Sequence, residues 1–242
     1  MIIEVCIDSV QSAINAEQAG AARVELCDNL FEGGTTPSAG AITLSRQRIA
    51  IGLQVIVRPR GGDFLYSDVE MEVMKKDVST AKELGADGVV IGILTADGQV
   101  DVEHCAQLID LAYPMNVTFH RAFDMSRDPM EALESLISLG CQRVLTSGQQ
   151  RTAVEGKKLI EQLHQKAKGR IIIMPGGGVD EFNMGQFEAI GIGECHVSAR
   201  MSVASGMAYR NQQVYMGGEL RLPEYEIKVA DPERLKKITG RA

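Results

Sequence analysis

A strand–helix alternation repeats eight times along this chain. Short runs of β-branched and other apolar residues are each followed by a loop and a longer stretch with helical spacing. Such alternation is typical of a parallel sheet, and eight copies predict closure into a (β/α)8 TIM barrel of the α/β class. The expected strands span residues 2–7, 23–27, 53–58, 88–91, 116–120, 143–146, 170–174 and 194–198.

The helical stretches begin and end with residues suited to those positions. Asp128 and Asp231 each precede a proline, which is the pattern of an N-cap with Pro at the first helical position. Gly20, Gly85 and Gly140 follow helical stretches, where glycine commonly ends a helix. The expected helices span residues 10–19, 38–50, 67–84, 102–112, 129–139, 152–168, 181–190 and 232–238.

The main alternative fold is an open, doubly wound sheet. That fold carries a Gly-rich phosphate loop after its first strand, whereas residues 8–11 contain no glycine. The 242 residues suit one barrel, and no linker or break in composition divides them. We therefore expect a single TIM-barrel domain over residues 1–242, with an excursion at about 199–230 between the last strand and the last helix.

The amino-acid composition excludes several classes of binding partner and cellular setting. Acidic residues outnumber basic ones by 32 to 25, for a net charge of −7, which argues against nucleic-acid binding. No apolar run is long enough for a membrane span, and the first residues lack the basic start of a signal peptide. The five cysteines show no CxxC spacing, which is typical of reduced thiols, so we expect a cytoplasmic protein.

Polar residues occupy the strand positions that should point into the barrel. Side chains alternate along a strand, and the apolar set should face the helices. Such an interior is either a hydrogen-bonded polar plug or a ligand site at the carboxyl ends of the strands, and the second interpretation is favoured because sites in this fold lie there. The polar residues expected to form an interior network are Glu4, Glu25, Glu194, Arg58, His120 and His196.

Cys6 and Cys27 share the inward parity on neighbouring strands. Neighbouring strands lie about 4.8 Å apart, so the two sulfurs can approach each other. Two thiolates form a soft ligand set that suits Cu(I). The alternative is a pair of small buried thiols, because free cysteine is among the most buried residue types.

The loops after the strands favour a small anionic ligand. Arg58 and Arg60 follow the third strand, and arginine offers a rigid set of donors to carboxylate or phosphate. Gly176, Gly177 and Gly178 follow the seventh strand, where TIM barrels often hold phosphate. A triple glycine is also what a tight turn requires.

Two further features bear on activity and assembly. If the protein is an enzyme, the candidate proton-transfer groups are Glu25, His120, Asp124 and His196. The long segment at 199–230 contains several Met and Tyr residues, Tyr215 among them, which suggests a lid or a subunit contact. Soluble oligomers are most often two-fold, so we expect a homodimer.

Several strings of the chain are similar to those of one known family. They include RVELC at 23–27, GGTTPS at 33–38, RPRGGDF at 58–64 and TFHRAFD at 118–124. These strings, which run from the first strand to the eighth, resemble the CutC family of copper homeostasis proteins. Thr35, where family members often carry Leu, touches no candidate ligand.

The resemblance implies a cytoplasmic TIM barrel with a part in copper handling. It also implies Cys6 and Cys27 as the candidate Cu(I) ligands. Two other hypotheses remain beside it. One is an enzyme acting on a small phosphorylated or carboxylated substrate at the barrel mouth, and the other is a barrel that only binds a partner.

Overall fold

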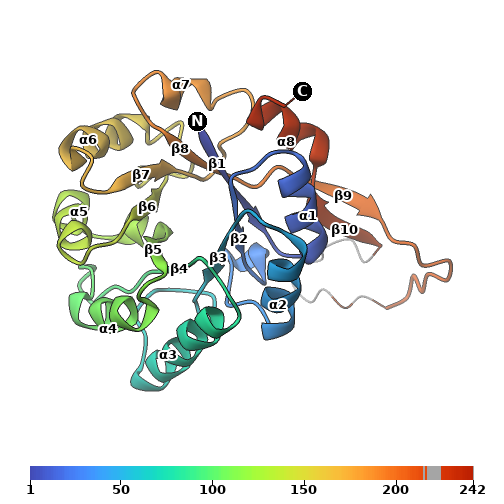
Figure 1. The fold of residues 1–242 in the computed structure, drawn as a ribbon, viewed down its shortest axis with the longest axis horizontal. Coiled ribbons are helices and arrows are strands. Elements are labelled where there is room, and N and C mark those ends of the chain that lie inside the picture. The colour runs from blue at the N-terminus through green and yellow to red at the C-terminus, as the bar shows by residue number, and fades with distance from the viewer. Residues whose placement is uncertain (215, 217–224, 242) are drawn as a thin grey trace.

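The computed structural model describes residues 1–214, 216 and 225–241. Eight parallel strands form one sheet in the order β7-β6-β5-β4-β3-β2-β1-β8, whose two edges meet so that the sheet nearly closes into a barrel (Figure 1). The predicted TIM-barrel fold is confirmed. The strands are β1 (Ile2–Ile7), β2 (Arg23–Leu26), β3 (Gly52–Ile56), β4 (Gly88–Ile91), β5 (Asn116–Phe119), β6 (Arg143–Thr146), β7 (Ile172–Pro175) and β8 (Glu194–Val197).

Helices surround this barrel (Figure 1), and side-chain caps fix where several of them begin. The Asp128 carboxylate accepts hydrogen bonds from the Met130 and Glu131 amides, and Ser67 forms a capping box with Glu70. The α-helices are α1 (Val10–Gln18), α2 (Ala39–Arg48), α3 (Asp68–Glu83), α4 (Val102–Ala112), α5 (Pro129–Ser138), α6 (Lys157–Ala167), α7 (Gly185–Glu188) and α8 (Pro232–Thr239). Two short 3₁₀ helices, η1 (Leu30–Glu32) and η2 (Arg121–Met125), follow β2 and β5.

Most helices match the expected ranges to within a few residues, but α6 and α7 are each six residues shorter. Residues 152–156 form turns, so α6 begins five residues later than expected. Only four residues of the expected helix at 181–190 are α-helical, because residues 181–184 form turns. Both shortened helices follow the Gly-containing loops after β6 and β7, where the chain turns before it enters a helix.

The two faces of the barrel strands differ as the alternation predicts. Val5, Leu26 and Val55 are fully buried between the strands and the helices. A separate small apolar cluster lies inside the barrel, where Cys27, Ile56 and Val90 pack together with Cys6 and Leu30 beside them. The rest of the barrel interior is largely polar, and these polar side chains build the site.

The excursion after β8 contains two strands that the sequence reading did not predict. Strands β9 (Arg200–Ala204) and β10 (Glu226–Ala230) pair antiparallel as a ribbon beside the barrel (Figure 1). Asn15 on α1 donates to the carbonyl of Ala230, which ties the ribbon to the helix layer. Residues 215 and 217–224, including Tyr215, lie outside the described residues.

Candidate functional site

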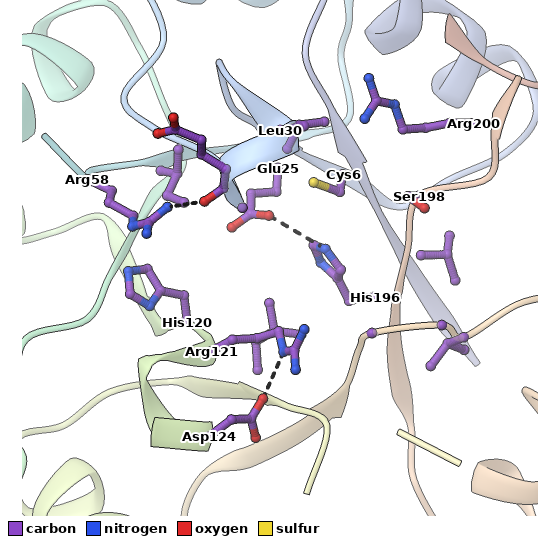
Figure 2. A pocket seen from close by; sticks show the side chains of 18 of the residues that line it. Cys6, Glu25, Leu30, Arg58, His120, Arg121, Asp124, His196, Ser198 and Arg200 are labelled. Atoms are coloured by element: carbon purple, nitrogen blue, oxygen red, sulfur yellow. Dashed lines mark hydrogen bonds and ion pairs between the residues drawn. The ribbon is translucent and has the colours of Figure 1, made fainter. Parts of the chain in front are cut away.

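A cavity of about 500 Å³ opens at the carboxyl ends of the strands. Loops and strand ends from most of the barrel contribute its lining (Figure 2). Cys6 comes from β1, Glu25 from β2 and His196 from β8, and they face His120 and Arg121 from the opposite side. This is the end of a TIM barrel at which ligands bind.

A buried ionic layer lies beneath the cavity. Arg23 forms ion pairs with Glu4 and with Glu194, and Arg143 adds a 2.9 Å pair to Glu194. Each charge is therefore paired, as burial requires. This corrects the predicted network in two respects. Its guanidinium groups are those of Arg23 and Arg143, and neither Arg58 nor His120 takes part in it.

His196 links the ionic layer to the cavity. Its Nδ1 lies 2.9 Å from Glu4, and its Nε2 lies 3.6 Å from Glu25, a contact drawn in Figure 2. Burial opposes the charge on His196, but the hydrogen bonds that it donates to Cys6 and Glu4 outweigh burial and raise its pKa well above the usual value. Burial likewise opposes the charge on Glu4, yet His196 and Arg23 lower that pKa to about 2. Glu4 and His196 therefore form a charged pair.

Cys6 and Cys27 lie side by side, as their shared parity predicts. Their sulfurs are 3.9 Å apart. Cys6 is half-buried and lines the cavity, whereas Cys27 is 2% exposed and lies behind it. The hydrogen bond from Cys27 lowers the pKa of Cys6 to about 5, and the same contact, with burial, raises the pKa of Cys27.

Cys6, Glu25 and His196 together form a potential metal-binding group. One ligand atom from each lies within 4.8 Å of the other two. Burial, and then the negative charge on Cys6, raise the pKa of Glu25 well above its usual value. A protonated carboxyl is a poor metal ligand, so the soft sulfur and the imidazole are the stronger donors of this group.

The other three cysteines lie away from this cluster. Cys105, Cys141 and Cys195 are free and buried in the layer between strands and helices. Burial raises the pKa of Cys141 and of Cys195 to about 12. These thiols are therefore inert packing groups.

His120 lies across the cavity from His196 (Figure 2). Its Nδ1 accepts a 3.1 Å hydrogen bond from the amide of Ala122, so the proton of the neutral ring is on Nε2. That Nε2 is buried and has no partner among the described residues. Burial, together with the charge of Arg58, lowers the pKa of His120 to about 3. His120 is therefore a neutral donor at pH 7.

The two predicted anion-binding arginines hold loops of the protein itself. Arg58 Nη1 donates to the carbonyls of Glu32 and Gly34, each at 2.8 Å, and Nη2 donates to Gly62. Arg60 pairs with Glu70 at 2.5 Å and does not line the cavity. The sequence could not reveal these backbone partners. The guanidinium groups that line the cavity besides Arg58 belong to Arg121 and Arg200.

Asp124 joins the segment after β5 to the loop after β6 at the rim. Its carboxylate accepts hydrogen bonds from the hydroxyl of Thr146 at 2.5 Å, from the Ser147 and Gln149 amides and from Arg121. This arrangement leaves little capacity for proton transfer. All four candidate proton-transfer groups line the cavity, but Asp124 serves to hold two segments of the rim together.

The three glycines after β7 have different environments. A Cβ on Gly176 would lie 2.4 Å from a Leu145 methyl and 3.2 Å from the Cβ of His196, so Gly176 permits close packing. Gly177 and Gly178 have φ of +92° and +77°, which side-chain-bearing residues rarely adopt. These two also line the cavity.

The fold and site together define a single-domain TIM barrel whose mouth holds the thiol pair of Cys6 and Cys27 and, sharing Cys6, the group of Cys6, Glu25 and His196. The CutC family model matches residues 1–201. The copper homeostasis protein cutC homolog of Mus musculus is 53% identical over 240 residues, which cover 99% of this chain and 88% of that protein. The chain belongs to the CutC family.

Solved structures agree with this assignment. The putative copper homeostasis protein CutC from Streptococcus agalactiae is 36% identical, with a TM-score of 0.79 over 82% of this chain and 98% of that chain. Phosphoribosyl anthranilate isomerase from Thermus thermophilus shares only the fold, at 12% identity and a TM-score of 0.61, over 100% of this chain and 98% of that one. Among the described residues, no helix combines the length and apolar character of a membrane span.

Proposed function

We propose that this protein binds Cu(I) as part of copper homeostasis, with Cys6 and Cys27 as thiolate ligands. The observation that carries the proposal is the 3.9 Å separation of the two sulfurs inside the barrel mouth. Soft thiolates select Cu(I), and one of the pair opens onto the cavity through which an ion can enter. Copper is the cargo of this site.

The sulfur separation favours a third ligand. With metal–sulfur bonds of about 2.3 Å, two sulfurs at this distance subtend about 115° at the metal, which is a trigonal angle. His196 supplies the third donor through Nε2, because its Nδ1 is held by Glu4. Such an outer carboxylate orients a ligating imidazole. Binding requires deprotonated ligands, so Cu(I) releases protons from Cys27 and from His196.

The free cysteines fit a reducing compartment, and the exposed ribbon fits a two-fold assembly. All five cysteines are free thiols, and we propose that the protein works in the cytoplasm. We further propose a homodimer that uses the β9–β10 ribbon, because this ribbon exposes Met201 and Ile227, at 37% and 53%, rather than burying them.

The test is an anaerobic competition titration with a Cu(I) chelator of known affinity. We expect one Cu(I) per chain in the native protein and at least a hundredfold weaker binding in the Cys6→Ser, Cys27→Ser variant. Cys195→Ser is the matched control, since Cys195 is on β8 beside His196 but faces the helices. Equal affinity in the double variant and the native protein would refute the proposal.

A further inference from the structure

The loop after β7 lines the cavity with residues whose backbone amides are free. Gly177, Gly178 and Val179 all line it. Within the described part of the chain, their three N–H groups donate to no other group. The positive φ of both glycines curves the loop. Successive free amides in a curved loop form a concave site that attracts anions.

Arg121 lies directly beside this loop. Its Nε donates to Asp124 at 2.8 Å and its Nη2 donates to Ser147 at 2.7 Å, which fixes the guanidinium. Its Nη1 has no partner within the described residues. A Cβ on Gly177 would lie 3.3 Å from that Nη1. The free guanidinium nitrogen and the loop therefore face the same small space.

His120 also lines the cavity, beside Arg58 and across from His196 (Figure 2). The side chain is 5% exposed, and its Nε2–H is buried without a partner among the described residues. An unpaired buried donor is costly, and in a residue that lines the cavity it favours an acceptor supplied by a ligand. The groups named above that follow β5 and β7 and lack a partner within the described residues are the three loop amides, Arg121 Nη1 and His120 Nε2, and all of them are hydrogen-bond donors.

We propose that the cavity binds a small phosphate monoester, with the phosphate held by the amides of Gly177 to Val179 and by Arg121. The Nε2–H of His120 donates to an oxygen of the organic part. Amides and a guanidinium that converge from two loops suit a phosphate group, whose oxygens point in several directions. The loop after β7 is also where TIM barrels commonly hold phosphate.

This site is separate from the proposed copper site. It uses groups that follow β5 and β7, whereas Cys6, Cys27 and His196 belong to β1, the end of β2 and β8. The cavity of about 500 Å³ has room for a ligand of metabolite size beside the thiols. Phosphate binding can therefore be tested independently of copper binding.

Calorimetric titration with inorganic phosphate and with glycerol 3-phosphate, in the presence of a metal chelator, tests the proposal. We expect both to bind the native protein and acetate to bind at least tenfold more weakly. The Gly177→Ala variant should bind both phosphates at least tenfold more weakly, because its methyl group would occupy the space beside Arg121. The matched control is Gly169→Ala, which has φ of +75° at the end of α6 and open space around its Cβ.

Other variants keep the test decisive. Arg121→Met should weaken both phosphates, which covers the case in which Gly177→Ala does not fold. His120→Phe should weaken glycerol 3-phosphate more than inorganic phosphate, whereas His120→Gln, which keeps a donor, should weaken it less. The Cys6→Ser, Cys27→Ser variant should bind phosphate as the native protein does. The proposal would be overturned if the native protein bound neither phosphate, or bound acetate as tightly as phosphate. It would also be overturned if Gly177→Ala and Arg121→Met bound phosphate as tightly as the native protein, or if a folded Cys6→Ser, Cys27→Ser variant lost phosphate binding.

Discussion

Arg23 is the residue on which the buried ionic layer depends. It lies between Glu4 and Glu194, and all three side chains are almost completely buried. Removal of one partner from such a group leaves uncompensated charge in the barrel interior. We expect Arg23→Leu to lower the free energy of unfolding by about 3–5 kcal/mol.

Urea unfolding at pH 7 measures the effect of Arg23→Leu. The matched control is Arg170→Leu, which removes an exposed ion pair with Glu134 and should lower the free energy of unfolding far less, because solvent screens such pairs. Similar losses in the two variants would show that the buried layer contributes no more than a surface pair.

His120 predicts a dependence of stability on pH. Burial and Arg58 lower its pKa to about 3, below the usual value of 6.5. Between these pH values the unfolded chain binds a proton that the folded protein does not. Stability is therefore fully present above about pH 6.5 and falls with decreasing pH, by up to about 1.4 kcal/mol per unit, until about pH 3.

The pH dependence of stability should be compared between the native protein and the His120→Phe variant. Phe keeps a ring against Phe64, whose ring lies 5.1 Å from that of His120, but it cannot titrate. Chemical denaturation at several values between pH 6.5 and 4 should show a shallower loss of stability in the variant. Parallel losses would exclude a buried neutral His120.

At the scale of elements, β4 depends on a glycine at its start. A Cβ on Gly88 would lie 2.0 Å from the side-chain oxygen of Gln54 and 2.8 Å from the backbone oxygen of Asn116. Both neighbours belong to the strands paired with β4, so neither can move freely. We expect Gly88→Ala to lower the free energy of unfolding by about 1–3 kcal/mol.

Gly193→Ala is the matched control for Gly88→Ala. Gly193 directly precedes β8, and nothing lies within 4 Å of a Cβ built there. Thermal unfolding should show a clearly lower Tm for Gly88→Ala and an almost unchanged Tm for Gly193→Ala. Two equal shifts would mean that backbone freedom, rather than packing between strands, determines the effect.

The elements also show what the sequence can and cannot predict. Alternation of side chains along the strands was enough to place Glu4, Cys6, Glu25 and His196 inside the barrel, because one face of each strand is apolar. The same rule did not single out Arg23, which shares the inward parity at the very start of β2. Long side chains are harder to place, since Arg58 reaches backbone carbonyls 24 and 26 residues away along the chain.

Other features depend on contacts that no local pattern encodes. The β9–β10 ribbon joins segments more than 20 residues apart. Each strand alternates polar and apolar residues over only five residues, and no local pattern indicates that the two pair with each other. The free donors of His120 and Arg121 follow from which of their other nitrogen atoms are already bonded. Such details require the folded arrangement of several loops.

For the whole molecule, the exposed ribbon predicts the state of assembly. If two copies meet there, sedimentation velocity should give a mass of two chains at micromolar concentration. Ile227→Lys should shift the protein toward the monomer, because it places a charge on a face that excludes water in the dimer. A monomer at every concentration, in the native protein as well, would contradict the proposed assembly.

In the proposed copper site, two thiolates and one imidazole hold Cu(I) at the mouth of the barrel. X-ray absorption spectroscopy of the protein loaded anaerobically with one Cu(I) per chain tests it most directly. We expect two sulfur neighbours and one nitrogen neighbour, and the loss of one sulfur neighbour in the Cys27→Ser variant. A copper environment without sulfur, or one that Cys27→Ser leaves unchanged, would contradict the claim.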